Sequence, residues 1–418
     1  MCLLVAVNMM DRTTISIALP YIKDELHLSP TVQGLVLSGF FWSYTLMQLP
    51  AGWLLDRFGP RKVITVATGM WGISQLCMAV VSGGLSLIFA RLFLGVAEAP
   101  MSPGNAKLTS AWLARSERAR GAVLIDCGSP IGIGLGGITI AYLIATLDSW
   151  RLSFIIVAVF SLLLSIVAWR KLKDKPSDDP RINQAEIDLI ENDAFEKNST
   201  DEIPVEVKGL GIHKVSMLAI IVARFFWSMI YFGLLTWGPS YLSQARGFDI
   251  KSVGNATFFI FLLGGLGALS YGFLVDYMVK KGISRNIAFK SLFSLSGLVA
   301  FGIFLYLPHI SDPIVAVGLL SLASFFVTGV GSVYWSLPAL LAHKSRAGLV
   351  GGIMNMAGSV GGILIPIIVG LILQFTASFN GVLMLFAFCS IMYLLGSLLI
   401  RFDGRSNQYV GKAALEVK

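Results

Sequence analysis

Long apolar runs separated by polar connectors dominate the pattern of this chain. Twelve runs of about 20 apolar residues occur, each long enough to cross the roughly 30 Å hydrocarbon core of a bilayer as a helix. The runs lie at 1–21, 33–55, 62–82, 85–107, 119–142, 152–171, 214–242, 252–275, 287–308, 314–342, 347–373 and 380–401. The first has neither a basic leader nor a small-residue cleavage site, so we expect a span whose cytoplasmic leader is absent and not a signal peptide. The pattern predicts an all-α membrane protein with twelve transmembrane helices.

The composition agrees with a membrane protein and argues against other classes. Hydrophobic residues make up 55% and charged residues 13% of the 418 positions, against about 25% charged in soluble proteins. The net charge of +8 does not indicate a nucleic-acid partner, because Lys and Arg are confined to short connectors. Cys2, Cys77, Cys127 and Cys389 are scattered and form no CxxC or His/Cys cluster, so we expect no disulfide framework, metal or cofactor.

Basic residues lie in alternate connectors, and this asymmetry predicts the orientation. They follow the second, fourth, sixth, eighth, tenth and twelfth runs: Arg57, Arg61, Lys62, Arg115, Arg118, Arg120, Arg170, Lys171, Lys173, Lys175, Lys280, Lys281, Arg285, Lys344, Arg346, Arg401 and Arg405. By the positive-inside rule both termini are cytoplasmic. We expect a monomer in the bacterial inner (plasma) membrane.

A polar segment divides the chain into two related halves. We interpret the charged residues 172–213 as a cytoplasmic linker, because such a composition cannot bury enough apolar surface to fold alone. The predicted domains are a six-helix bundle at 1–171, this linker, a second six-helix bundle at 214–401 and a cytoplasmic tail at 402–418. Gly52-Trp-Leu-Leu-Asp56 recurs as Gly272-Phe-Leu-Val-Asp276 after the corresponding run, so we expect pseudo-symmetric bundles and a substrate site near the midplane, as in transporters built from parallel repeats.

Four charged residues inside apolar runs are candidates for chemistry. Arg91 and Glu98 in the fourth run are seven residues apart and therefore share one helix face. A charge near mid-bilayer costs at least ~2.5 kcal/mol, so each should face an aqueous cavity or a partner. Asp11 and Arg12 in the first run are adjacent and point about 100° apart, so they cannot neutralise each other well. Each of the four needs a partner from elsewhere.

The decapeptide from Gly52 to Arg61, Gly-Trp-Leu-Leu-Asp-Arg-Phe-Gly-Pro-Arg, resembles the loop signature of the major facilitator superfamily at every signature position. With twelve spans and a central linker, the resemblance covers the whole chain. It implies that this loop latches the cytoplasmic side of the transporter. The residues expected to gate are Gly52, Asp56, Arg57, Gly59 and Arg61, with Asp276 in the repeat. Small glycines would let the turn approach a neighbouring helix, while Asp56 could accept hydrogen bonds from a helix N-terminus and pair with Arg57 or Arg61.

A narrower resemblance is to the anion:cation symporter branch of that superfamily. It rests on Asn8-Met-Met-Asp11-Arg12, on Tyr44, on the segment from Arg91 to Pro103 and on Thr236-Trp-Gly-Pro-Ser-Tyr241. That branch moves organic anions such as galactonate, glucarate, hexuronates, phthalates and sialic acid, in many members with protons or sodium. The resemblance implies that spans one and four line a cavity, so we expect the crossed pairs Asp11 with Arg91 and Glu98 with Arg12. The alternative for the first pair is a permanent brace between helices.

These residues suggest how anion binding could be coupled to protons. Protonating Asp11 or Glu98 would free an arginine, whose guanidinium can hold a substrate carboxylate in a bidentate fork. We therefore assign Asp11 and Glu98 to proton coupling and Arg12, helped by Arg91, to anion binding. Neutral side chains that could bind substrate hydroxyls are Tyr44, Gln48, Tyr231, Tyr334, Ser336 and Asn355, the alternative being ordinary helix packing.

Asp126 is a departure from the branch, whose sugar-acid members carry a neutral amide near this position. It could bind substrate hydroxyls, carry a further proton or pair with an arginine. Taken together, the sequence predicts a secondary active transporter that carries a small organic anion, a sugar acid or related carboxylate, in symport with protons by alternating access. The alternative is an organic-anion exchanger or facilitated exporter without proton coupling. No HExxH or GxSxG motif indicates an enzyme.

Overall fold

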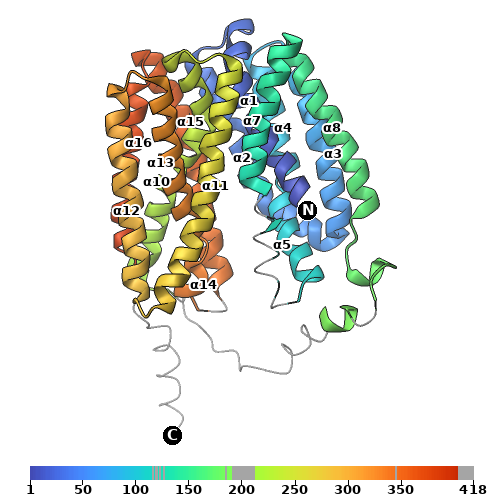
Figure 1. Ribbon diagram of the computed structural model, residues 1–418. Coiled ribbons are helices and arrows are strands. Elements are labelled where there is room, and N and C mark those ends of the chain that lie inside the picture. Colours follow the sequence, from blue (N-terminus) through green and yellow to red (C-terminus); the bar gives the residue numbers. More distant parts are fainter. Residues whose placement is uncertain are drawn as a thin grey trace. The chain divides into compact units, whose positions relative to one another are not determined.

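The computed structural model describes residues 1–114, 117, 121, 124–125, 128–183, 186–190, 212–343 and 346–402. Within these residues the chain is helical and has no strand (Figure 1). The first six runs contain α1 (Cys2–Glu25), α2 (Pro30–Phe58), α3 (Pro60–Ala79), α4 (Gly84–Glu98) with α5 (Met101–Trp112), α7 (Gly128–Leu147) and α8 (Trp150–Lys171). The last six contain α10 (Lys214–Ser240) with the π-turn Tyr241–Ala245, α11 (Ile250–Lys280), α12 (Arg285–Tyr306), α13 (Pro313–Tyr334) with α14 (Leu337–Leu341), α15 (Ala347–Thr376) and α16 (Asn380–Leu398).

The lengths and compositions of these helices are those of membrane spans. Among the described residues, ten helical segments are long and apolar enough to cross a membrane. Helices α2 and α3, of 29 and 20 residues, have a more polar composition and fall outside this set. A helix satisfies its own backbone hydrogen bonds, which is the requirement that lipid imposes on a spanning segment. The chain is a multi-pass integral membrane protein.

Several helix starts are defined by local sequence. Ser29 and Ser284 each accept a hydrogen bond from the backbone N–H three residues later, at the beginning of α2 and α12. Asp312 accepts from the N–H groups of Ile314 and Val315, and Pro313 fills the first position of α13. These caps satisfy N–H groups that have no partner within the helix, and proline there loses nothing because it has no N–H.

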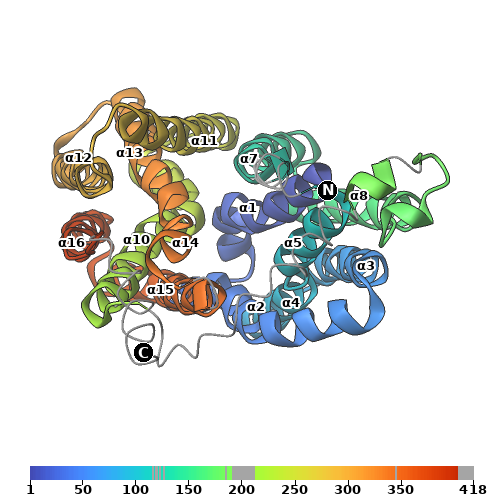
Figure 2. The ribbon, with the colours of Figure 1, turned by 90° about the horizontal axis from the view of Figure 1, so that it is seen from below.

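The described residues fall into two compact units. The first comprises the described residues up to 190 together with Asp249–Asn255, and the second comprises those from 212 to Phe248 and from Ala256 onward. In the first unit α1 packs against α7, α2 against α4, and α3 against α8. In the second, α10 packs against α15, α11 against α13, and α12 against α16 (Figure 2). The same ordinal pairs of spans therefore pack in each half, as expected for an internal repeat.

Glycines allow the closest of these approaches at matching places. A Cβ on Gly132 of α7 would lie 2.1 Å from the carbonyl oxygen of Ala6 on α1. A Cβ on Gly361 of α15 would lie 2.1 Å from Ser228 Oγ and 2.7 Å from the carbonyl oxygen of Phe225, both on α10. Small residues at helix interfaces are a common way to pack membrane helices tightly. The first helix of each unit is thereby held against the fifth span by backbone contact.

The fourth span of each unit is interrupted. Helix α4 ends at Glu98, and α5 begins at Met101 after Ala99 and Pro100. Helix α13 ends at Tyr334, and α14 begins at Leu337, with Pro338 in its first turn. Proline lacks the N–H that would donate to the preceding turn, so it interrupts the backbone hydrogen bonds of the helix. Each interruption immediately follows a residue of the candidate site.

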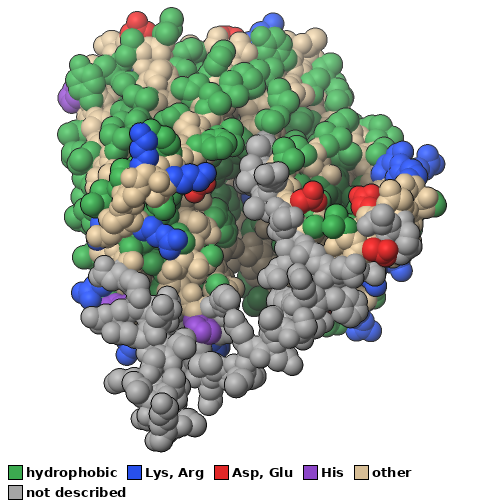
Figure 3. Space-filling model, turned by 60° about the horizontal axis from the view of Figure 1, so that its bottom comes forward, with side chains coloured by type: hydrophobic (Ala, Val, Ile, Leu, Met, Phe, Trp, Pro, Cys, Tyr) green, Lys and Arg blue, Asp and Glu red, His purple; other side chains and the backbone are tan. Residues whose placement is uncertain are grey.

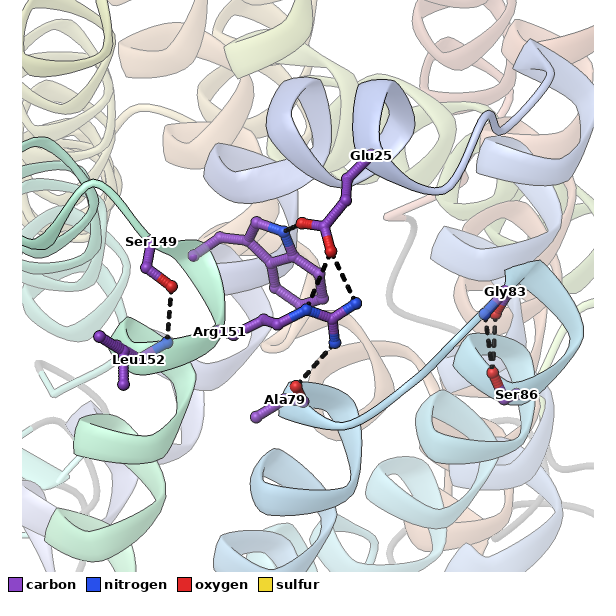
Figure 4. A network of polar contacts seen from close by, with 8 residues as sticks. Glu25, Ala79, Gly83, Ser86, Ser149, Arg151 and Leu152 are labelled. Carbon is purple, nitrogen blue, oxygen red and sulfur yellow. Dashed lines mark hydrogen bonds and ion pairs between the residues drawn. The ribbon is translucent and has the colours of Figure 1, made fainter.

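A polar network joins the end of α1 to two other helices (Figure 4). Arg151, at the start of α8, donates from Nε and Nη2 to one oxygen of Glu25 at 3.0 and 2.8 Å, and from Nη1 to the carbonyl oxygen of Ala79, the last residue of α3, at 2.8 Å. The indole N–H of Trp150 donates to the other oxygen of Glu25. Because the ion pair is partly exposed, its net contribution is about 0–1 kcal/mol. Its main consequence is geometric, since it aligns α1, which carries Asp11 and Arg12.

Candidate functional site

A buried ion pair joins α1 to α4 in the first unit. Arg12 Nε donates to Glu98 Oε2 at 2.9 Å, and the two side chains are 9% and 0% exposed. Asn8, one helical turn before Arg12, accepts from its Nη2 at 3.4 Å. This is one of the two crossed pairs expected from the sequence. A charged pair this deep is stable only when its remaining polar atoms are also satisfied, because both groups have lost their water.

Aromatic rings of α2 hold the two arginines. The Arg12 guanidinium carbon lies 4.8 Å from the ring centres of both Phe40 and Tyr44. The Arg91 guanidinium carbon lies 5.0 Å from the ring of Phe40, which is fully buried. Cations over desolvated rings gain up to about 2 kcal/mol each. Phe40 therefore contacts the guanidinium groups of both Arg12 and Arg91, and Tyr44 contacts Arg12.

The second expected pair, Asp11 with Arg91, is not formed. Asp11 is 0% exposed, and among the described residues neither of its carboxyl oxygens has a hydrogen-bond partner. Arg91 is 1% exposed, and its Nε and Nη1 are likewise unsatisfied within the described part of the chain. Gln75 of α3 is a polar neighbour of Asp11, although no hydrogen bond of normal length joins them. Arg91 contacts the ring of Phe40, and this contact uses none of its N–H donors.

The four charges sum to zero when all are ionised, but only two of them form an ion pair with each other. Arg12 and Glu98 neutralise each other directly, whereas Asp11 and Arg91 retain unsatisfied polar atoms. A buried polar group without a hydrogen bond costs free energy, so such groups are places where a proton, water or ligand binds. The unit thus contains a carboxyl group and an arginine available for new partners.

The expected hydroxyl-binding residues of α2 lie beside this cluster. Tyr44 is half-buried and stacks on Phe40 with ring centres 5.4 Å apart. Gln48 is half-buried and four residues further along α2, so it shares a helix face with Tyr44. The structure therefore brings Arg12, Glu98, Arg91 and Tyr44 together, with Gln48 on the adjoining turn. Asp126 lies outside the described residues.

The candidates of the second unit have partners of their own. The hydroxyl groups of Tyr334 and Ser397 are hydrogen-bonded at 2.6 Å, and Tyr334 is fully buried. The Ser336 hydroxyl donates to the carbonyl oxygen of Val333 at 2.7 Å. Tyr231 and Asn355 are half-buried on α10 and α15. In this conformation the Ser336 hydroxyl could still accept a hydrogen bond, whereas Tyr334 is fully buried.

Arg224, on α10, is a buried cation that the sequence interpretation overlooked. It is 6% exposed, and its guanidinium carbon lies 4.0 Å from the ring centre of Trp227. A signal was present, because Arg224 is a charge inside the apolar run 214–242. It lacks the feature that drew attention to Arg91, namely a carboxylate on the same helix face.

Residues 1–366 match the model of a family described as the Major Facilitator Superfamily. The chain belongs to this superfamily. It is 32% identical over 405 residues to "Probable galactarate/D-glucarate transporter GarP" of Escherichia coli (strain K12), covering 92% of this chain and 89% of that protein. It is 30% identical to "Hexuronate transporter" of Bacillus subtilis (strain 168), with 91% and 88% covered, and 30% identical to "D-galactonate transporter" of Escherichia coli O6:H1, with 88% and 87% covered. A transport protein of this superfamily is not an enzyme.

The fold agrees with solved structures of the major facilitator superfamily. A bacterial homologue of the human lysosomal transporter Spinster, in an inward-facing and occupied conformation, superposes with a TM-score of 0.72 at 13% identity, covering 99% of this chain and 95% of that one. The same homologue in an unoccupied conformation gives 0.71 at 15% identity, with 99% and 96% covered. At such identities the likeness concerns the fold alone. The twelve-helix, all-α fold expected from the sequence is confirmed.

The superfamily signature loop is held differently from the expectation. Asp56 accepts from Lys107 Nζ at 2.8 Å, and Lys107 also donates to the carbonyl oxygen of Leu55 at 2.7 Å, which ties α5 to the end of α2. The acceptor at the N-terminus of α3 is Asp174, whose Oδ1 accepts from the Arg61 backbone N–H at 2.7 Å. A carboxylate there is favoured by the helix dipole. Asp56 is thus paired with a lysine of α5, and Asp174, from beyond α8, takes the capping role.

The remaining loop residues also have defined surroundings. The Arg61 guanidinium donates to the carbonyl oxygen of Trp169 and stacks on its ring at 4.8 Å. Arg57 lies over the rings of Trp53 and Phe58, at 5.2 and 5.4 Å. Gly59 has φ +83, which other residues rarely adopt, and a Cβ there would also meet Asp174. A Cβ on Gly52 would meet nothing within 4 Å, so close helix approach does not explain that glycine in this conformation. Asp276 in the repeat is exposed.

Proposed function

We propose that this transport protein is a proton-coupled symporter of a small organic anion, a sugar acid or related carboxylate, working by alternating access. The named relatives support the substrate class, because three of them carry galactarate/D-glucarate, hexuronate or D-galactonate in their names. The observation that carries the proposal is the buried pair between Arg12 and Glu98 beside Asp11, whose carboxyl oxygens have no hydrogen-bond partner in the part of the chain that the structure describes. Neither the coupling ion nor the substrate follows from the fold itself.

Competition for Arg12 is the proposed coupling step. Glu98 Oε2 accepts the Arg12 Nε–H at 2.9 Å, so an ionised Glu98 occupies a donor that a substrate carboxylate would need. When Glu98 gains a proton, its attraction to the guanidinium falls, and the N–H edge of Arg12 can take the substrate in a bidentate fork. Release of the proton on the other side of the membrane restores the pair and expels the anion. Proton and anion then move in the same direction.

Asp11 and Arg91 supply the second half of the proposed site. Both are buried with unsatisfied polar atoms, so each can accept a partner without first breaking an ion pair. Asp11 is assigned to carry a coupling proton, and Arg91 to hold the anion together with Arg12. Tyr44 and Gln48 on α2, with Tyr231, Asn355, Tyr334 and Ser336 in the second unit, are assigned to hydroxyl groups of the substrate. Asp126 is assigned to the same site.

The signature loop is proposed to gate the cytoplasmic side. Gly52, Asp56, Arg57, Gly59 and Arg61 lie at the junction of α2 and α3, and Asp276 takes the equivalent position in the repeat. The contact of Asp56 with Lys107 links this junction to α5, directly after the helix that ends with Glu98. A change at Glu98 could therefore reach the loop along α5 and across the ion pair between Lys107 and Asp56.

The charge pattern supports an inner-membrane location with both termini cytoplasmic. The surface is largely hydrophobic along the helices, and Lys and Arg side chains gather toward the end that comes forward in Figure 3. Basic residues concentrate in the connectors that follow even-numbered spans. Such a bias is the feature that orients membrane proteins during insertion.

Replacement of Glu98 by Gln tests the coupling. In proteoliposomes with an inward proton gradient, the unaltered protein should concentrate labelled galactarate, D-galactonate or a hexuronate. Glu98→Gln removes the titrating group and keeps the shape, so it should exchange anion across the membrane but fail to concentrate it. Asp24→Asn, which neutralises an exposed acid at the end of α1 away from the site, is the control and should still concentrate the anion.

Two results would count against the proposal. Concentration of substrate by Glu98→Gln at the unaltered level would exclude Glu98 as the coupling group. Uptake by the unaltered protein that is the same with and without the proton gradient would favour an exchanger or a facilitated exporter.

A further inference from the structure

Arg224 is a buried cation that the coupling scheme does not use. It lies near the middle of α10 and is 6% exposed. Its Nε and Nη1 are buried and have no hydrogen-bond partner among the described residues. Leaving such donors unsatisfied is costly, because the guanidinium has lost water without gaining an acceptor. Buried charges in proteins are ordinarily paired, so this one needs an explanation.

The sequence of this half contains no acid that could pair with Arg224 within the membrane. Between residues 212 and 402 the acidic residues are Asp249, Asp276 and Asp312. Asp249 precedes α11, Asp276 is exposed near the end of that helix, and Asp312 caps the start of α13. Each therefore lies at or near the end of a helix, whereas Arg224 is eleventh of the 27 residues of α10. Arginine stays protonated under all ordinary conditions, and the acids of its own half lie too near the helix ends to balance this charge.

The guanidinium is held on a rigid aromatic support. Its carbon lies 4.0 Å from the ring centre of Trp227 and 5.2 Å from that of Trp335. Trp227 is fixed by an N–H bond of 2.6 Å to the carbonyl oxygen of Val327 and by a parallel stack on Tyr231 at 5.2 Å. Contact with a ring stabilises the cation but uses none of its N–H donors. The donors of Arg224 thus remain available on a preorganised support.

An exposed ring and a glycine lie beside the Arg224 guanidinium. Trp335 follows α13, at the interruption of the fourth span, and is 56% exposed. It therefore links the buried guanidinium to the surface of its unit. On another side, a Cβ placed on Gly358 of α15 would lie 3.2 Å from Arg224 Nε. Glycine at this position leaves beside the buried Nε the room that a methyl group would occupy.

The geometry points to a second anion-binding subsite, built by Arg224 with Trp227 and Trp335, that takes a carboxylate group of the transported anion. This inference rests on the proposed transport of organic anions and adds a residue to it. In the first unit two buried acids, Asp11 and Glu98, match the two buried arginines in number, whereas no buried acid of the second unit's described residues accompanies Arg224. A planar guanidinium matches a carboxylate through two parallel N–H bonds, which a lysine could not supply.

Variants of Arg224 separate binding from structure. Arg224→Gln removes the charge, Arg224→Lys keeps the charge without the fork, and Arg285→Gln removes an exposed arginine of the same unit as a control. We expect the KM for galactarate exchange in proteoliposomes to rise about tenfold or more in Arg224→Gln, as for loss of charged hydrogen bonds, and less in Arg224→Lys. The KM of Arg285→Gln should equal that of the unaltered protein.

Thermal unfolding in detergent provides the structural readout. Without ligand, Arg224→Gln should melt at or above the unaltered protein, because it removes a buried charge that forms no ion pair with the described residues. Galactarate should raise the melting temperature of the unaltered protein and of Arg285→Gln, and this shift should be reduced in Arg224→Gln. A lower melting temperature without ligand, together with an unchanged KM, would identify Arg224 as a structural group and overturn the inference.

Two further comparisons define the ligand and its relation to coupling. If sodium chloride gives the same Arg224-dependent thermal shift as sodium galactarate, an inorganic anion fills the subsite and the carboxylate assignment is wrong. If uptake by the unaltered protein is the same with and without the proton gradient, the symport proposal fails. The KM of Arg224→Gln would still decide whether Arg224 binds the anion. The two proposals can therefore fail separately.

Discussion

Replacement of Gly95 by Ala tests the packing that brings the candidate site together. Gly95 lies on α4, four residues after Arg91 and three before Glu98, where α4 meets α2. A Cβ on Gly95 would lie 2.2 Å from Ser43 Oγ, 2.3 Å from the carbonyl oxygen of Phe40 and 2.9 Å from the backbone nitrogen of Tyr44. The serine hydroxyl can rotate away, but the other two atoms belong to the backbone of α2. The helices would have to separate by about 1 Å to restore ordinary contact in a close-packed interface.

Two opposing contributions decide the sign of the effect. Alanine in a helix interior is favoured over glycine by about 0.5–1 kcal/mol. Forcing an extra methyl group into a packed interface costs about 1–3 kcal/mol. Because the obstructing atoms are backbone, the upper part of that range applies, and Gly95→Ala should be destabilising. Gly318→Ala in α13 is the matched control, since a Cβ there meets nothing within 4 Å and only the favourable contribution remains.

The measurements are thermal unfolding of the purified protein and anion exchange in proteoliposomes. We expect Gly95→Ala to lower the melting temperature and Gly318→Ala to leave it unchanged or raise it. Exchange should also fall in Gly95→Ala, because the displaced helix carries Glu98 away from its 2.9 Å contact with Arg12. A Gly95→Ala protein that melts at or above the unaltered protein and exchanges anion at the same rate would refute the close approach of α2 and α4.

Two further predictions concern the first unit. Arg12→Lys keeps the positive charge but loses the planar guanidinium that can hold a carboxylate through two N–H bonds. We therefore expect the KM for anion exchange to rise about tenfold or more, with little change in melting temperature. An unchanged KM would show that Arg12 does not hold the substrate. Asp174→Ala removes the acceptor of the Arg61 backbone N–H at the start of α3. It should lower the free energy of unfolding by about 0.5–2 kcal/mol, which a lower melting temperature would show. An unchanged melting temperature would mean that the 2.7 Å contact contributes nothing to stability.

Much of the architecture was predictable from the order of residues alone. A run of apolar residues in lipid must satisfy its backbone hydrogen bonds within itself, so helix number and approximate position follow from local composition. The spacing of Arg91 and Glu98 likewise defines one face of one helix without reference to any other part of the chain. The repeat of the Gly52–Asp56 motif at Gly272–Asp276 indicates two related halves for the same local reason.

Partners across helices could be decided only by the tertiary structure. The sequence interpretation paired Asp11 with Arg91, but in the structure Arg91 contacts the ring of Phe40, and the Asp11 oxygens have no hydrogen-bond partner among the described residues. It also overlooked Arg224, which contacts the rings of Trp227 on α10 and of Trp335 just after α13. Helical periodicity defines which side chains share a face. It does not define which face of a neighbouring helix lies opposite, because that depends on how closely glycines such as Gly95 and Gly132 let the backbones approach.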